Sequence, residues 1–359
     1  MFTLSRSLAA VAGSIALVAV AAAADTGWRD VLDTPAAKSP LAARTLVNGL
    51  ASAGKRCVAV GGRGHVLFSD DAGTTWQQAD VPVSSDLVAV SFPSATTGFA
   101  VGHDGVVLRS TDAGATWTRQ LDGVRAGEAM VDFYTREQNG ALAADPKRAA
   151  AVLEDAKRFA AQGAENPFLD VWFESDTSGL VVGAFGLILR TTDAGATWQP
   201  LMHAVDNPKA LHLYAVRGIG TDVYIAGEQG LVLKLDRATG RFRALDLPYK
   251  GTLFGVMGNS RAIVVYGLRG TVLRSVDGGR AWQTIETGVQ AGLTAGTVDA
   301  EGRFVIVSQA GHVLVSRDDG ATFKPAQVDR PTPAAAVIGV ADNTVVVAGP
   351  RGIQTQTLQ

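Results

Sequence analysis

The chain has 359 residues, and its 32 lysines and arginines nearly balance 34 aspartates and glutamates, for a formal net charge of −2. That balance argues against nucleic-acid binding, which needs a concentrated basic face. The single cysteine, Cys57, cannot form an internal disulfide, and we expect it to be a small buried residue rather than a reactive thiol.

Residues 1–24 are predicted to be a secretory signal peptide. Arg6 supplies the positive start, residues 8–20 are apolar, and residues 22–24 are three alanines suited to cleavage. The segment is too short and too rich in alanine for a membrane span, although an uncleaved N-terminal anchor is the alternative. Cleavage would change the net charge to −3, because only Arg6 is lost. We expect secretion across the inner membrane into the periplasm, or into the thylakoid lumen of a photosynthetic organism.

A motif with an aspartate–glycine turn and a following aromatic residue recurs through residues 25–359. The motif occupies residues 69–76, 110–117, 191–198, 275–282 and 316–323, with a degenerate copy at residues 235–242. The aromatic residues that end the copies are 41, 81, 44, 40 and 41 residues apart. The interval of 81 is one period of about 41 with an insert of similar length, and such regular spacing indicates a repeat architecture.

One repeat contains four short apolar segments, which in the second copy are residues 87–92, 99–101, 106–109 and 116–119. Glycine, proline and aspartate separate these segments, as in an antiparallel meander. Such a sheet cannot bury both faces alone. Packed radially against copies of itself, it becomes a propeller blade.

The number of blades follows from a glycine-bounded turn between the second and third strands. This turn occurs seven times, at residues 61–64, 102–105, 183–186, 227–230, 267–270, 308–311 and 349–352. The last repeat has no room for a fourth strand before Gln359, and residues 27–32 resemble a fourth strand. We therefore predict an all-β, seven-bladed propeller of four-stranded antiparallel blades over residues 25–359, closed by the N-terminal strand.

A helical insert is predicted within the propeller at residues 125–166, between blades 2 and 3. Asp145 and Pro146 form a helix start, apolar residues recur every three or four positions, and Gly163 is a helix stop. Residues near 127–138 are expected to form a second helix. Because the insert connects two blades, we expect it on the face that carries the glycine turns.

That face is the predicted partner-binding surface. The residues assigned to it are Arg63, Phe185, Arg269, Arg351, Val152 and Phe159. Together they would form a mixed cationic and apolar surface for a membrane-protein complex or another envelope protein. The alternative is that the turn residues are simply solvated and that the helix caps the channel.

The aspartate turns are predicted to be structural. Aspartate accepts hydrogen bonds from backbone N–H groups ahead of it, glycine supplies positive φ, and the aromatic ring packs between blades. These residues are Asp71, Trp76, Asp112, Trp117, Asp193, Trp198, Asp277, Trp282, Asp318 and Phe323. The turns lack the ligand pattern of a calcium loop, and no cysteine or histidine spacing resembles a zinc site. No catalytic residue, metal or cofactor is therefore expected.

The pattern Ser/Thr-x-Asp-x-Gly-x-Thr-Trp resembles the Asp box of bacterial neuraminidase repeats. Combined with the preceding Gly-x-x-Gly-x-x-Leu-x-Ser, the chain resembles the photosystem II stability/assembly factor family (Ycf48-like), whose repeats are of the WD40/YVTN-like type. The resemblance implies a non-catalytic propeller, secreted to the lumen or periplasm, that acts as an assembly or stability factor for a membrane complex. The helical insert departs from the repeat pattern. Relatives in bacteria without photosystems suggest an accessory of another envelope system, for example a transporter.

Two alternatives stay open at this point. A sialidase-like glycoside hydrolase needs an arginine cluster, a tyrosine nucleophile and carboxylates on one face. The residues available for these roles are Arg63, Arg269, Arg351, Tyr266, Asp104 and Glu228. Sialidase cores, however, have six blades. A carbohydrate-binding propeller needs an aromatic platform, for which Phe185 is the candidate.

Overall fold

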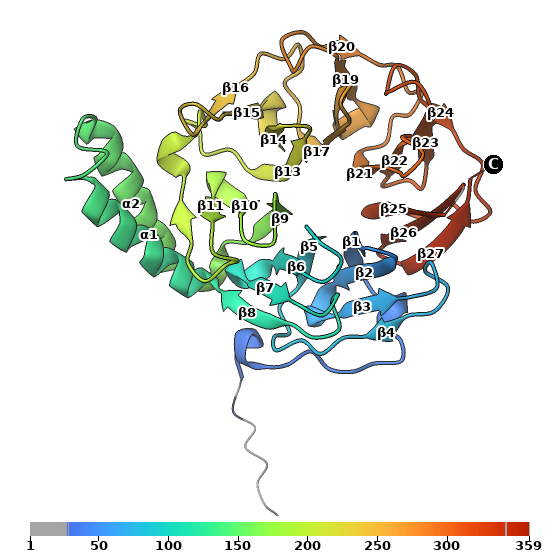
Figure 1. Ribbon diagram of the computed structural model, residues 1–359, viewed down its shortest axis with the longest axis horizontal. Helices are drawn as coiled ribbons and strands as arrows, with labels where there is room; N and C mark the ends of the chain where they lie inside the picture. Colours follow the sequence, from blue (N-terminus) through green and yellow to red (C-terminus); the bar gives the residue numbers. More distant parts are fainter. Residues whose placement is uncertain (1–26, 28, 342, 359) are drawn as a thin grey trace, which may run out of the picture.

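The computed structural model describes residues 27, 29–341 and 343–358; the predicted signal peptide and Trp28 lie outside the described residues. Seven antiparallel sheets surround a central axis (Figure 1). Six sheets have four strands in sequential order and the seventh has three. The predicted seven-bladed propeller is confirmed, and we number its blades 1 to 7 along the chain.

Blades 1 to 4 are meanders in which the first strand lies at the axis. Blade 1 contains β1 (Val47–Ala53), β2 (Arg56–Gly61), β3 (Val66–Ser69) and β4 (Gln77–Gln78). Blade 2 contains β5 (Leu87–Ser91), β6 (Gly98–Gly102), β7 (Val107–Ser110) and β8 (Thr118–Leu121). Blade 3 contains β9 (Phe168–Phe173), β10 (Gly179–Gly183), β11 (Ile188–Thr191) and β12 (Gln199–Pro200). Blade 4 contains β13 (Leu213–Ile219), β14 (Asp222–Gly227), β15 (Val232–Asp236) and β16 (Arg241–Ala244).

Blades 5 to 7 continue the same order. Blade 5 contains β17 (Leu253–Gly258), β18 (Ile263–Gly267), β19 (Val272–Ser275) and β20 (Gln283–Thr284). Blade 6 contains β21 (Leu293–Val298), β22 (Phe304–Ser308), β23 (Val313–Ser316) and β24 (Lys324–Pro325). Blade 7 contains β25 (Ala336–Ala341), β26 (Thr344–Gly349) and β27 (Gly352–Thr357).

The second strands carry most of the core between blades. Every residue of β6, β10, β18 and β22 is buried, because each of these strands is covered on both faces by neighbouring blades. This explains their unbroken apolar sequences, which would not suit a strand with one solvated face. Cys57 in β2 is part of this core, and burial raises the pKa of its thiol to about 11, as expected of a structural cysteine.

The prediction that residues 27–32 close the ring is wrong. Blade 7 has three strands, and residues 31–33 instead form a short 3-10 helix, η1 (Val31–Asp33), beside blades 1 and 2. The Asp30 carboxylate accepts a hydrogen bond from the Leu32 N–H at 2.9 Å, which stabilises a turn in place of an extended strand.

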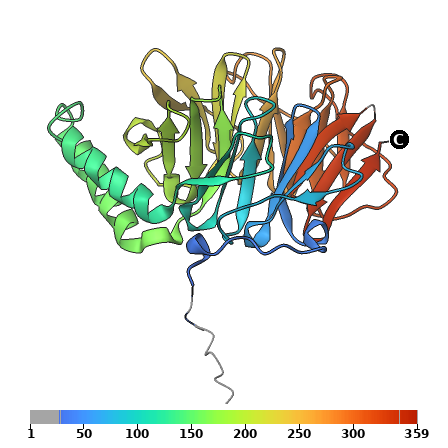
Figure 2. The same ribbon diagram turned by 60° about the horizontal axis from the view of Figure 1, so that its bottom comes forward.

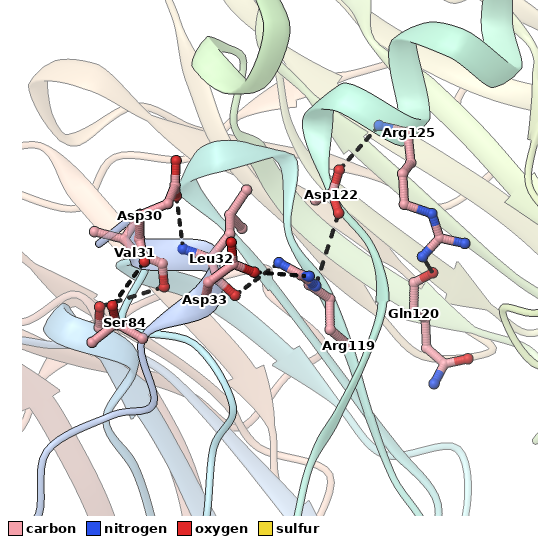
Figure 3. A network of polar contacts seen from close by, with 10 residues as sticks. Asp30, Val31, Leu32, Asp33, Ser84, Arg119, Gln120, Asp122 and Arg125 are labelled. Atoms are coloured by element: carbon pink, nitrogen blue, oxygen red, sulfur yellow. Dashed lines mark hydrogen bonds and ion pairs between the residues drawn. The ribbon is translucent and has the colours of Figure 1, made fainter. Parts of the chain in front are cut away.

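Two further contacts hold η1 in place (Figure 3). The Val31 carbonyl accepts a hydrogen bond from the Ser84 N–H at 2.8 Å, and the Arg119 Nη1 donates to the Leu32 carbonyl at 2.8 Å. The ring is closed by packing of blade 7 on blade 1, where the Thr355 hydroxyl donates to the Gly73 carbonyl at 2.9 Å.

Both predicted helices of the insert are present. They are α1 (Gly123–Glu137) and α2 (Pro146–Gln162), which form a hairpin between β8 and β9. Each begins at an aspartate: Asp122 accepts from the Arg125 N–H and Asp145 from the Arg148 N–H, both at 3.0 Å. Among the described residues, no helix is both long and apolar enough to cross a membrane.

The hairpin leans against the outer edge of blade 3 (Figures 1 and 2). Its base lies next to the short helix η4 (His103–Gly105), because a Cβ on Gly123 would stand 3.1 Å from the Asp104 carbonyl oxygen. Farther along, the Tyr134 hydroxyl lies 3.2 Å from the His203 Nδ1, which follows β12. The insert thus starts on the face of the glycine turns, as its position between blades predicts.

Candidate functional site

The turns between the second and third strands lie on one side of the ring, which we call the glycine-turn face. Five of them are short 3-10 helices: η3 (Gly62–Gly64), η4, η6 (Ala184–Gly186), η8 (Glu228–Gly230) and η9 (Leu268–Gly270). The middle residue of each has a left-handed backbone, with φ between 53° and 58°. These residues are Arg63, Asp104, Phe185, Gln229 and Arg269.

A close backbone approach anchors each of these turns to the start of the first strand. In blade 1, the Gly62 N–H donates to the Leu46 carbonyl at 3.1 Å. A Cβ on Gly61 would stand 2.1 Å from that same carbonyl oxygen, so only glycine fits there. The glycine that begins each turn therefore holds the turn next to the mouth of the central channel.

The structure places the four predicted turn residues on this face but spreads them around the ring. Arg63, Phe185, Arg269 and Arg351 belong to blades 1, 3, 5 and 7, and all four are exposed. Only blades 7 and 1 are neighbours, so Arg351 and Arg63 share one sector of the face. Phe185 and Arg269 stand in other sectors.

The two predicted helix residues are placed differently from our expectation. Val152 is 2% exposed and Phe159 is 4% exposed, because both pack into the core formed by α1, α2 and blades 2 and 3. The apolar stripe of α2 is therefore explained by packing within the chain. Val152 and Phe159 do not present a surface to a partner in this arrangement.

Exposed apolar side chains are concentrated on the glycine-turn face and its rim. The large hydrophobic residues that are exposed among the described residues are Val31, Leu41, Leu46, Val124, Phe185, Leu268 and Val276. Phe185 and Leu268 lie in glycine turns, Val31 in η1, and Val124 at the start of α1. Leu41 immediately precedes η2 (Ala42–Arg44), and Leu46 immediately precedes β1. Val276 alone lies at an Asp box on the opposite side. Apolar residues gathered on one face are typical of an interaction surface.

A chain of aromatic rings leads from this face towards the axis. Phe185 in η6 makes an edge-to-face contact with His212, with ring centroids 4.7 Å apart. His212 lies 6.2 Å from Tyr214, which lies 5.5 Å from Phe254. The Phe185 N–H also donates to the His212 Nδ1 at 2.9 Å, which fixes the orientation of the imidazole. The rings belong to blades 3, 4 and 5.

The last two of these rings line the central channel, a cavity of about 600 Å³. Inside it, Arg217 of β13 forms an ion pair with Asp170 of β9, and the Val216 N–H donates to the same carboxylate at 2.7 Å. The Asp170 side chain is 5% exposed, whereas that of Arg217 is 44% exposed. Arg217 therefore presents part of its guanidinium to the channel.

Opposing effects act on the pKa of the Asp170 carboxyl. Burial raises the pKa of Asp170, while Arg217 and the Val216 N–H act in the opposite direction. The nearby Tyr266 fills the space above Gly255, where a Cβ would stand 2.1 Å from its ring, and burial raises the pKa of its phenol. The channel thus offers one cationic group beside aromatic and aliphatic walls.

The residues considered for a hydrolase are not assembled into one site. Arg63 and Arg269 point outward from turns in blades 1 and 5, and Tyr266 is buried between strands. Across the described parts of the chain, no group of three or more histidine, cysteine, aspartate or glutamate side chains is arranged to hold a metal ion.

The carboxylates of the Asp boxes accept hydrogen bonds from residues of their own turns. Asp71 accepts from the Thr75 N–H at 2.8 Å and from the Thr75 hydroxyl at 2.6 Å, and these bonds lower the pKa of its carboxyl to about 2. The Trp76 indole donates to the Gly73 carbonyl at 3.1 Å. At the other four boxes, the Asp carboxylate likewise accepts a hydrogen bond from the backbone N–H four residues ahead. These aspartates are Asp112, Asp193, Asp277 and Asp318.

The fold and its Asp boxes together define a seven-bladed Asp-box propeller. The chain belongs to the family described as photosynthesis system II assembly factor YCF48, whose model matches residues 25–111 and 157–328. The unmatched residues between these segments include all of α1 and the first part of α2. Most of the helical hairpin thus lies outside the residues that the family model matches.

Individual relatives agree with this assignment. The chain is 27% identical over 161 residues to the photosystem II assembly lipoprotein Ycf48 of Synechococcus sp. (strain CC9902), covering 44% of this chain and 48% of that protein. The chain thus matches about half the length of this relative.

Solved structures show the same fold. A structure described as YCF48 bound to D1 peptide has a TM-score of 0.62 at 15% identity, covering 88% of this chain and 94% of the other. YCF48 from Cyanidioschyzon merolae has a TM-score of 0.60 at 15% identity, covering 89% and 97%. The WD40 propeller domain of Doa1 has a TM-score of 0.62 at 8% identity, covering 91% and 96%.

Sequence reasoning missed the channel residues. Asp170 and Arg217 each interrupt an otherwise apolar first strand, and this is the signal that could have found them. The aromatic chain left no comparable signal, because its members are scattered over 70 residues from Phe185 to Phe254.

Proposed function

We propose that this protein is a non-catalytic assembly or stability factor that binds an extended segment of a membrane-protein partner on the glycine-turn face. The single observation that carries the proposal is the gathering on that side of the ring of six of the seven large apolar residues that are exposed in the described part of the chain. The aromatic chain from Phe185 to Phe254 continues this surface into the channel. Such a surface suits a peptide with apolar anchors.

The family supports the class of partner. One relative is named an assembly lipoprotein of photosystem II, and one structural neighbour is described as bound to a peptide of D1. A membrane complex is therefore the proposed client, either a photosystem or, in an organism without one, another envelope system such as a transporter. Secretion by the predicted signal peptide would place the propeller on the outer side of the membrane that holds the client.

On the glycine-turn face, basic and apolar side chains lie in different sectors. Arg63 and Arg351 give the sector of blades 7 and 1 a basic character, while Phe185 and Val124 lie on the side of blades 2 and 3. We propose that an extended partner segment crosses the channel mouth with acidic residues near the arginines and apolar residues near Phe185.

Affinity capture from detergent-solubilised membranes tests this proposal. Phe185→Ala and Leu268→Ala should together reduce recovery of the partner by about tenfold, because apolar anchors carry most of the binding energy of such surfaces. Val276→Ala is the matched control, since it removes an exposed apolar side chain from the opposite side. Equal recovery with both sets of variants would contradict the proposal.

A further inference from the structure

The degenerate repeat of blade 4 lies beside a cavity between blades 3 and 4. In the Asp boxes of blades 1, 2 and 6, the glycine packs on the second strand of the preceding blade. A Cβ on Gly73 would stand 2.5 Å from Val346 of blade 7, and one on Gly320 would stand 2.6 Å from Val264 of blade 5. In blade 4, Thr239 stands at the position of this glycine, and a Cβ on the next residue, Gly240, would meet no atom within 4 Å.

The residue that should receive this contact is Leu180 in β10. Its register matches Val264: Gly179 pairs with Thr191, just as Ile263 pairs with Ser275, and the packed residue follows in each case. Instead of packing under an Asp box, Leu180 lines a cavity of about 160 Å³ between blades 3 and 4. The cavity thus lies where the sequence of residues 235–242 departs from the Asp box.

The interior of the cavity is apolar and partly aromatic. Trp172 lines it from blade 3, with its ring lying over Gly218, and Val223 and Phe242 line it from blade 4. An apolar cavity of about 150 Å³ is large enough to bind benzene. The volume here thus fits one six-membered ring or a branched alkyl group.

The rim is cationic, and the side chain of one arginine has no polar partner among the described residues. Arg237 is engaged by Glu174, at 2.8 Å, and by the Thr221 carbonyl. Arg190 has the same position in blade 3 as Arg274 in blade 5, immediately before the Ser/Thr of the box. The Arg274 Nε donates at 2.7 Å to the carbonyl of Asp319, in the Asp box of the next blade. That box is missing after Arg190, whose exposed side chain has no polar partner among the described residues.

We propose that this cavity, which we call the blade 3–4 pocket, binds a small carboxylate carrying a single aromatic or branched apolar group. The apolar group enters between Trp172 and Leu180, and the carboxylate accepts hydrogen bonds from Arg190 in place of the missing Asp-box carbonyl. The pocket's lining residues Glu174 and Ser178 belong to the turn between β9 and β10, on the side opposite the glycine turns. It is therefore independent of the partner surface proposed above.

Ligand-observed fluorine NMR with 3-(4-fluorophenyl)propionate tests the pocket on the full secreted chain. We expect saturable binding with a Kd of about 1 mM or tighter, as befits a ligand of this size. Arg190→Gln should weaken it by about tenfold or more, because it removes a charge-assisted hydrogen bond. Arg243→Gln is the control: Arg243 is an exposed arginine of β16 that does not line the pocket, so this variant should leave binding unchanged. The corresponding amide, 3-(4-fluorophenyl)propanamide, should bind more weakly than the acid.

Two further variants fill the cavity. Leu235→Trp enlarges a lining side chain, and replacement of residues 235–242 by the sequence of residues 191–198 restores an Asp box of the same length. Both should abolish binding, with the thermal midpoint confirming that each chain folds. If the propionate fails to bind up to several times the expected Kd, or if Arg190→Gln and Leu235→Trp leave binding unchanged, the proposal is wrong. Equal binding of acid and amide would overturn the role of Arg190.

Discussion

The guanidinium of Arg217 in β13 and the carboxylate of Asp170 in β9 form an ion pair that joins blades 3 and 4 inside the channel. Their environments differ, because Asp170 is almost fully buried while Arg217 is 44% exposed. The Val216 N–H also donates to the Asp170 carboxylate, so the anion has two partners and the cation keeps donors for the channel.

This asymmetry predicts unequal costs of breaking the pair. Arg217→Met leaves a buried carboxylate without its cation and should lower the free energy of unfolding by about 3 kcal/mol. Asp170→Asn keeps an acceptor for the Val216 N–H and leaves a cation that reaches the channel, so it should cost about 1 kcal/mol. Urea denaturation of both single variants and the double variant measures this. Additive effects, or a larger loss for Asp170→Asn, would contradict the described pairing.

The glycine turns predict a contrast between two glycines. Gly61→Ala places a Cβ 2.1 Å from the Leu46 carbonyl oxygen and should destabilise the protein by about 3 kcal/mol or more, since backbone must move. Gly220→Ala is the control: it has φ of 61° but no neighbour within 4 Å, so it should cost about 1 kcal/mol. Thermal unfolding of both variants compares them, and similar losses would show that the turn is not held by close approach.

The Asp boxes predict acid sensitivity. The folded-state pKa of Asp71 is lowered from 3.8 to about 2 by its bonds to Thr75, and the pKa values of Asp112, Asp193, Asp277 and Asp318 are also lowered. A lowered carboxyl pKa stabilises the fold above the unfolded pKa, and this contribution is lost as pH falls through the folded value. Stability should therefore fall between about pH 4 and pH 2.

Asp71→Asn isolates one box. The variant should be less stable than the native chain at pH 7, and the difference should shrink towards pH 2, where the native carboxyl takes up a proton. Equilibrium unfolding in urea at a series of pH values measures the difference. A difference in the free energy of unfolding that stays constant with pH would mean that the charge of Asp71 does not contribute to stability.

His203 predicts a second pH dependence, linked to the helical hairpin. Burial lowers the pKa of His203, with Arg148 and Arg241 acting in the same direction, so the folded chain keeps the imidazole neutral. Since the unfolded chain takes up the proton more readily, stability should decline as pH falls below about 6.5. His203→Gln should reduce this decline, as measured by the thermal midpoint between pH 5 and pH 8; an unchanged pH profile would assign the decline to another group, such as His65.

The sequence predicted the parts of this molecule that depend on local chemistry. The turn at Asp71 and the cap at Asp145 each need only residues a few positions away, so their spacing revealed the blades and α2. The position of η1 depends instead on Ser84 and Arg119, which are far away in the sequence. Resemblance to a fourth strand could not reveal those contacts.

The candidate site was predicted only in outline. The glycine-turn face and its exposed residues Arg63 and Phe185 followed from the topology of a meander. The burial of Val152 and Phe159 did not, because an apolar helical stripe has the same pattern whether it packs on its own chain or on a partner. The contact between Tyr214 and Phe254 joins two blades and needed the assembled ring.

Site-specific photo-crosslinking tests the partner surface most directly. A photoreactive phenylalanine analogue is placed at Phe185 on the glycine-turn face or, as the control, at Val276 on the opposite side, and both proteins are irradiated with native membranes. We expect a discrete adduct with a membrane-protein subunit from position 185 and none from position 276. The same adduct from position 276, with none from position 185, would contradict the assignment of the glycine-turn face.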